Sequence, residues 1–176
     1  ILIFFVQYNG FDNSGNTSHK QKLRINMMNT LKNKVITSIA GLDTLPIRIA
    51  AGIIFVAHGS QKLFGWFGGY GLEGTAAWMD SIGLSPGLPM TALAGSAEFV
   101  GGLLLIIGLL VRPVALALAA TMAVAIASVH IGNGLFMANN GYEFALALLA
   151  VSVALLFRGA GSLSVDRVLQ ANLSQN

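Results

Sequence analysis

Long apolar stretches separated by short polar connections dominate the chain after residue 44. Four of them, at 45–64, 90–111, 113–131 and 142–157, predict membrane-spanning helices. Each gives about 25–30 Å of helix at about 1.5 Å per residue, enough to cross the hydrocarbon core of a bilayer. Only Arg112 and Pro113 separate the second stretch from the third, which predicts a tight hairpin there. We therefore expect an all-α, up-and-down four-helix membrane bundle.

Basic residues alternate along the connections in a way that predicts orientation. Lysines and arginines precede the first span, are absent from 65–89 and 132–141, and return at Arg112, Arg158 and Arg167. Because cytoplasmic connections carry an excess of Lys and Arg, this pattern places both termini in the cytoplasm and the two longer loops outside.

The first 40 residues differ from the rest and suggest a separate segment. After an apolar run at 1–6 they are mostly polar and basic, so we expect an N-terminal extension over 1–40 that is either disordered or, with Met27 or Met28 as the true start, not native. Residues 41–169 form the expected membrane domain, and 170–176 a polar tail.

Composition excludes several classes of protein. Hydrophobic residues make up 55% of the 176 and charged residues 10%, with a mean hydropathy of +0.72. A soluble domain carries about 25% charged residues, so an ordinary soluble enzyme is excluded. The absence of cysteine removes disulfides, thiolate metal sites and iron–sulfur clusters, and without a motif such as H-E-x-x-H we expect no metal site. The basic residues are too dispersed for nucleic-acid binding.

Ionisable residues inside the spans are the candidate site, because such residues are costly in a membrane. Depth and orientation together predict a charged pocket in the outer half of the bilayer, to which all four helices contribute. We expect Glu98 to pair with His58 or Lys62, and Arg48 to lie toward the cytoplasm. A structural pair between helices and a lysine that extends to the interface are the alternatives. The predicted catalytic residues are His58, Glu98 and His130, and the predicted substrate-binding residues are Lys62, Arg48 and Glu143.

Several separated motifs resemble the DoxX-like membrane proteins. They are Arg48-x9-His58-Gly59-x2-Lys62-Leu63-Phe64-Gly65, Glu98-x2-Gly101-Gly102, Gly108-Leu109-x2-Arg112, His130, Glu143 and the tail 159–166, where Ala160 replaces the usual proline. The resemblance covers about residues 45–169 and implies a four-helix inner-membrane protein of bacterial type. Members are described as oxidoreductase components, some linked to quinone-coupled sulfur oxidation and others to complexes that resist oxidative and thiol stress.

The resulting functional hypothesis is a redox-associated, quinone- or sulfur-linked membrane subunit. We expect no intrinsic cofactor and take quinone as the candidate mobile one, since no redox-cofactor motif is present. The expected partners are the lipid bilayer and a redox subunit or a second copy of the chain. Two alternatives stay open: a small permease or ligand-binding module, and a structural or assembly subunit. Whether the chain catalyses a reaction by itself is left open too.

Overall fold

The computed structural model describes residues 44–173, and the statements below concern this part of the chain. The predictions for residues 1–40 and for the last three residues of the tail lie outside it. Between residues 44 and 173 the chain is helical and has no strand, which confirms the all-α class. The longer helices are α2 Leu45–Phe64, α3 Gly71–Ser81, α4 Gly87–Ile107, α5 Val111–Ala125, α6 Glu143–Arg158 and α7 Val165–Leu173. Short 3-10 turns occur at Trp66–Gly68, Ile131–Asn133 and Met137–Asn139, and a π-helical turn at Ile126–His130.

The predicted hairpin between the second and third helices is present, but its position at Arg112 and Pro113 is wrong, because the chain turns earlier. Helix α4 ends at Gly108, which has a φ of +73° and donates its N–H to the Leu104 oxygen over 2.9 Å. Glycine adopts this left-handed conformation without a steric penalty. Helix α5 then begins at Val111, and Pro113 lies in its first turn, where a missing N–H is tolerated. Arg112 is therefore a helical residue.

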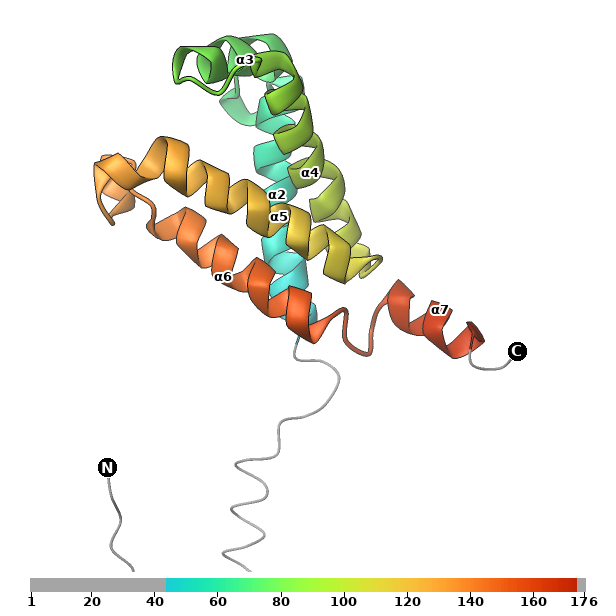
Figure 1. Cartoon of the computed structure of the whole chain (residues 1–176). Helices are drawn as coiled ribbons and strands as arrows, with labels where there is room; N and C mark the ends of the chain where they lie inside the picture. The colour runs from blue at the N-terminus through green and yellow to red at the C-terminus, as the bar shows by residue number, and fades with distance from the viewer. Residues whose placement is uncertain (1–43, 174–176) are drawn as a thin grey trace, which may run out of the picture. The chain divides into compact units, whose positions relative to one another are not determined.

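Glycines let α2 and α4 pack closely as an antiparallel pair. A Cβ on Gly52 would lie 2.7 Å from the Gly102 oxygen, and one on Gly59 would lie 2.8 Å from the Gly95 oxygen. The two glycines on each helix are seven residues apart, so they fall on one face after two turns. We call these four residues the glycine seam. Figure 1 shows α2 and α4 running side by side.

Helices α5 and α6 form a second antiparallel pair, which crosses the first (Figure 1). The apolar core lies where the pairs meet. Its largest members are almost fully buried and come from four helices: Phe55, Leu105, Leu118 and Leu155. Helix α3 packs against α4 at the end away from α7.

Two helical segments in the described part of the chain are long and apolar enough to cross a membrane, Gly87–Ile107 and Val111–Asn133. The second joins α5 to the turns that continue it. Helix α6 has only 16 residues, and α2 carries Arg48, His58 and Lys62. Passage of all four helices through the membrane, and the side on which each end lies, stay predictions.

Candidate functional site

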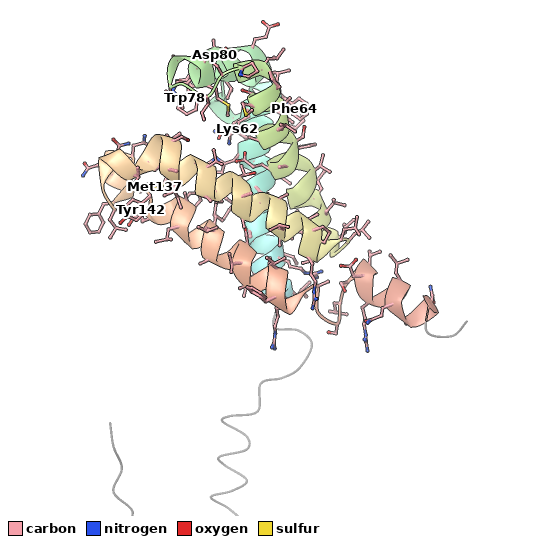
Figure 2. The ribbon with its side chains drawn as sticks, viewed as in Figure 1. Lys62, Phe64, Trp78, Asp80, Met137 and Tyr142 are labelled. Carbon is pink, nitrogen blue, oxygen red and sulfur yellow. The ribbon has the colours of Figure 1, made fainter. Side chains whose placement is uncertain are left out.

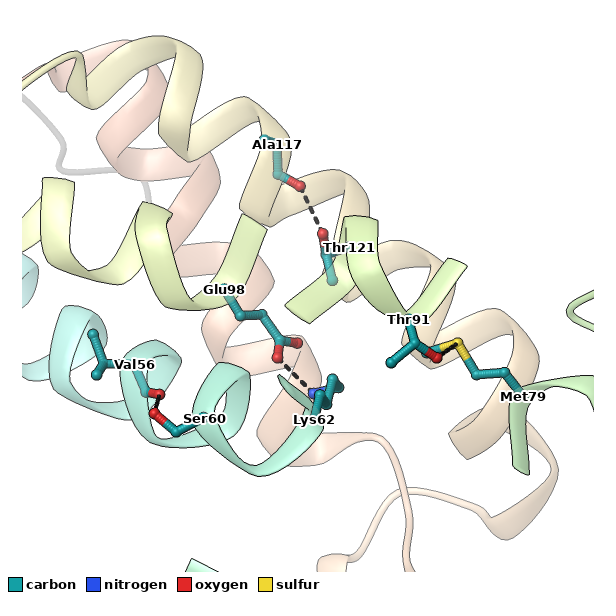
Figure 3. Close-up of polar contacts among 8 residues, drawn as sticks. All are labelled: Val56, Ser60, Lys62, Met79, Thr91, Glu98, Ala117 and Thr121. Carbon is teal, nitrogen blue, oxygen red and sulfur yellow. Dashed lines mark hydrogen bonds and ion pairs between the residues drawn. The ribbon is translucent and has the colours of Figure 1, made fainter. Parts of the chain in front are cut away.

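The centre of the candidate site is an ion pair between α2 and α4. Lys62 Nζ donates to Glu98 Oε2 over 2.5 Å, as Figure 3 shows. The Glu98 side chain is 3% exposed and that of Lys62 is 25% exposed. Side chains in a helix lean toward its N-terminus, which directs Lys62 back along α2 to the level of Glu98. Of the two partners expected for Glu98, the structure therefore shows Lys62.

His58 lies one helical turn before Lys62 and close enough for the two side chains to interact electrostatically. It is half-buried, and its ring centroid lies 5.8 Å from that of Phe144 in α6. Helices α2 and α4 thus contribute one group of polar side chains, His58, Lys62 and Glu98, which we call the polar cluster. Phe144 of α6 packs against its histidine. Phe144 was not among the predicted site residues, because an aromatic residue at the start of an apolar helix has no distinguishing pattern.

His130 and Glu143 hydrogen-bond within the α5–α6 connection. His130 Nδ1 donates to the Asn140 oxygen over 2.9 Å, and Glu143 Oε1 accepts the Met137 N–H over 2.6 Å. Figure 2 shows Met137 and Tyr142 at the far end of this hairpin, and Lys62 on α2. These hydrogen bonds shape the connection and do not extend to the Lys62–Glu98 pair. The predicted catalytic role of His130 and substrate-binding role of Glu143 stay predictions.

Arg48 lies apart from the polar cluster, near the start of α2. It precedes His58 by ten residues, which is about 15 Å along a helix. Its side chain is completely buried, and Nη2 donates to the Leu163 oxygen over 2.6 Å. Nε and Nη1 have no hydrogen-bond partner in the described part of the chain. The structure thus places Arg48 against the segment that follows α6, and its predicted substrate-binding role stays a prediction.

Asp166, which was not among the predicted site residues, joins the C-terminal segment to the turn between α4 and α5. Its two carboxylate oxygens accept the N–H groups of Leu110 and Val111 over 2.8 and 3.0 Å. A carboxylate is favourable there, because the first N–H groups of a helix lack partners within it. Asp166 also interacts electrostatically with Arg48. We call Arg48, Leu163 and Asp166 the tail contact.

The polar cluster has the chemistry of a site that binds an anion or exchanges protons. A lysine and a carboxylate can each hold or release a proton, and imidazole side chains do so near neutral pH. The partly exposed Lys62 is the more accessible member of the pair. Burial of Glu98 is costly unless it is paired, so a ligand that attracted Lys62 would have to compensate the loss of that contact.

Comparison with known proteins gives a consistent family signal. The sequence profile of the DoxX family matches residues 44–131. A protein of Bacillus subtilis (strain 168) named "Putative oxidoreductase CatD" is 34% identical over 125 residues, which cover 71% of this chain and 85% of that protein. An uncharacterized protein of Haemophilus influenzae is 34% identical over 123 residues, covering 68% of this chain and 85% of its own length. No solved structure matches the chain.

Proposed function

Because this chain belongs to the DoxX family of membrane proteins, we propose that it is the membrane subunit of a quinone- or sulfur-linked redox system. In this proposal α2, α4, α5 and α6 cross the bacterial inner membrane, and both termini lie in the cytoplasm. The polar cluster then lies in the outer half of the bilayer. The Bacillus subtilis relative, whose name is "Putative oxidoreductase CatD", supports a redox role.

The Lys62–Glu98 pair is the observation that carries this proposal. Its two charges lie between two helices, with the imidazole of His58 one turn away. Reduction of a quinone to a quinol takes up two electrons and two protons, so a quinone site needs groups that deliver protons. We assign delivery of the protons to His58, their resupply to the Glu98 carboxylate, which takes up each proton and passes it on, and attraction of the polar head to Lys62. The electrons come from a partner subunit, since the chain has no redox-cofactor motif.

A structural role for the same pair is the second candidate. Lys62 and Glu98 connect the two helices that the glycine seam also joins, and such pairs can hold helices together in a membrane. The two functions differ in what they require of the residues. A structural pair needs opposite charges on α2 and α4 in either order, whereas a quinone site needs each group in its own place.

Glu98→Gln tests the redox proposal directly. The full chain is purified in mild detergent, and native mass spectrometry measures the quinone that each protein molecule retains. We expect the wild type to retain quinone and Glu98→Gln to lose about tenfold in affinity, because the neutral amide no longer holds the Lys62 ammonium in place to donate to the quinone oxygen, a charged hydrogen bond of roughly 1.5 kcal/mol. Glu73→Gln is the matched control, because Glu73 lies on an exposed face of α3.

The exchange of Lys62→Glu with Glu98→Lys separates the two candidates. If the pair is structural, each single change lowers thermal stability, and the double exchange restores it together with every function. If the pair binds quinone, the double exchange restores stability but not quinone retention. A wild-type protein that retains no quinone would argue against the redox proposal.

A further inference from the structure

The C-terminal helix α7 presents apolar side chains that the rest of the described chain does not cover. Val165, Val168 and Leu169 are 38%, 60% and 48% exposed. Their spacing of three and four residues places them on one face of the helix, while Arg167 and Gln170 lie on the other. An exposed apolar face on a helix requires a partner.

The contacts of Asp166 fix where α7 begins. Its carboxylate binds the first N–H groups of α5, and its own N–H donates to the Gly108 oxygen over 3.0 Å. In the described part of the chain α4 and the segment Val111–Asn133, which begins with α5, are long and apolar enough to cross a membrane, so their crossing would put the turn between them at a membrane boundary. Helix α7 therefore starts at that boundary, and Figure 1 shows it projecting away from α4, α5 and α6.

The neighbouring surface has the character of a membrane interface. Ile107 at the end of α4, Leu110 in the turn and Leu163 before α7 are 50%, 55% and 59% exposed. They lie in or beside the segments that join α4 to α5 and α6 to α7. Arg112 and Arg167 lie at the same end of these helices and can attract anionic headgroups.

We propose that α7 is an interfacial helix that lies on the membrane surface at the α4–α5 turn. Val165, Val168 and Leu169 enter the boundary between headgroups and acyl chains, and Arg167 and Gln170 lie on the face directed to the headgroups and water. The tail contact sets the depth of the helix, because it ties the first turn of α7 to the start of α5. This proposal requires the membrane location of the family but is independent of the redox role.

The absence of cysteine makes the proposal testable with single labels. Val168→Cys and Gln170→Cys are each labelled with an environment-sensitive fluorophore in the full chain. The proteins are placed in nanodiscs of phosphatidylcholine and phosphatidylglycerol. We expect nitroxide groups on the upper acyl chain to quench the label at 168 and aqueous iodide to quench the label at 170. Leu169→Ala should shift the helix from the bound to the free form by roughly tenfold, because it removes part of the apolar contact.

Two results would overturn the proposal. Equal quenching of both labels by iodide would show that α7 projects into water. A label at 168 that neither iodide nor the lipid nitroxide reaches would show that protein covers this face, either a second copy of the chain or another subunit. A failure of quinone retention would leave this test unaffected, so the two proposals can fail separately.

Discussion

Two acidic residues connect parts of the chain that are distant in sequence. Glu98 binds Lys62 across the α2–α4 contact, and Asp166 binds the start of α5 from a position 55 residues later. Each carboxylate meets groups that lack another partner of opposite charge or polarity, a lysine in one case and free helix N–H groups in the other. At this scale the fold depends on a few charged side chains with specific partners.

Replacement of Asp166 by alanine is expected to lower stability. The change removes two hydrogen bonds from the start of α5 and the negative charge near Arg48. Loss of a helix cap costs about 1–2 kcal/mol, and the buried guanidinium adds to that cost. The thermal unfolding midpoint of the detergent-solubilised protein should fall.

Arg167→Ala is the matched control for this prediction. Arg167 is exposed, and its side chain donates a hydrogen bond to Gln170 on the same helix. We expect little change in its unfolding midpoint, because exposed contacts contribute little. Similar midpoints for Asp166→Ala and Arg167→Ala would show that the cap does not stabilise the domain.

At the scale of elements, the contact between α2 and α4 depends on glycines, which have no side chain. At Gly52, Gly59 and Gly102 the facing backbone lies so close that a Cβ has no room, and at Gly95 a Cβ would meet the Leu63 side chain. Such contacts are common between membrane helices, where small residues allow close packing. The ion pair and the seam lie on the same helix pair, so the position of Glu98 relative to Lys62 depends on the fit of these glycines.

Gly59→Ala is therefore expected to destabilise the α2–α4 pair. The new Cβ would contact the backbone nitrogen of Phe99 and lie 2.8 Å from the Gly95 oxygen, and neither backbone atom can move without shifting a helix. Overpacking of this kind costs about 1–3 kcal/mol. Gly132→Ala is the control, because a Cβ there meets no atom within 4 Å. Unfolding midpoints that do not distinguish the two variants would contradict the prediction.

The elements were more predictable from sequence than the contacts between them. The bounds of α2 match the prediction, and α6 is offset by one residue, because Pro46 and the apolar runs are local signals. The turn was predicted at Arg112 and Pro113, although Gly108 is a local signal for the end of α4; the contact of this turn with Asp166, far along the chain, has no such signal. For the same reason the partner of Arg48, the backbone oxygen of Leu163, could not be read from any pattern.

For the candidate site, the sequence predicted which residues are unusual but not how they group. Intramembrane charge identified His58, Lys62 and Glu98, which the structure brings together. It identified His130 equally well, yet that side chain hydrogen-bonds the α5–α6 connection. Charge in a span indicates that a partner is needed, whereas the relative placement of the helices decides which partner is reached.

At the scale of the whole molecule, the number of membrane crossings decides where the two ends of the domain lie. If α4 and α5 alone cross, then α3, the α5–α6 connection and α7 all lie on one side. If α2 and α6 cross as well, α7 lies on the side opposite to the other two. The contact of Asp166 with the start of α5 favours the second arrangement, because it brings α7 to the end of α5 that is remote from the α5–α6 connection.

Single cysteines in this cysteine-free chain can distinguish these arrangements. Glu73→Cys in α3 and Asn139→Cys in the α5–α6 connection are exposed, as is Gln170→Cys in α7. With four crossings and cytoplasmic termini, a membrane-impermeant maleimide should label the first two in intact bacterial cells with a permeable outer membrane. It should label Gln170→Cys only after the inner membrane is opened.

Labelling of all three in intact cells would mean two crossings. Labelling of Gln170→Cys alone would keep four crossings and reverse the orientation, which would place the Lys62–Glu98 pair in the cytoplasmic half of the bilayer.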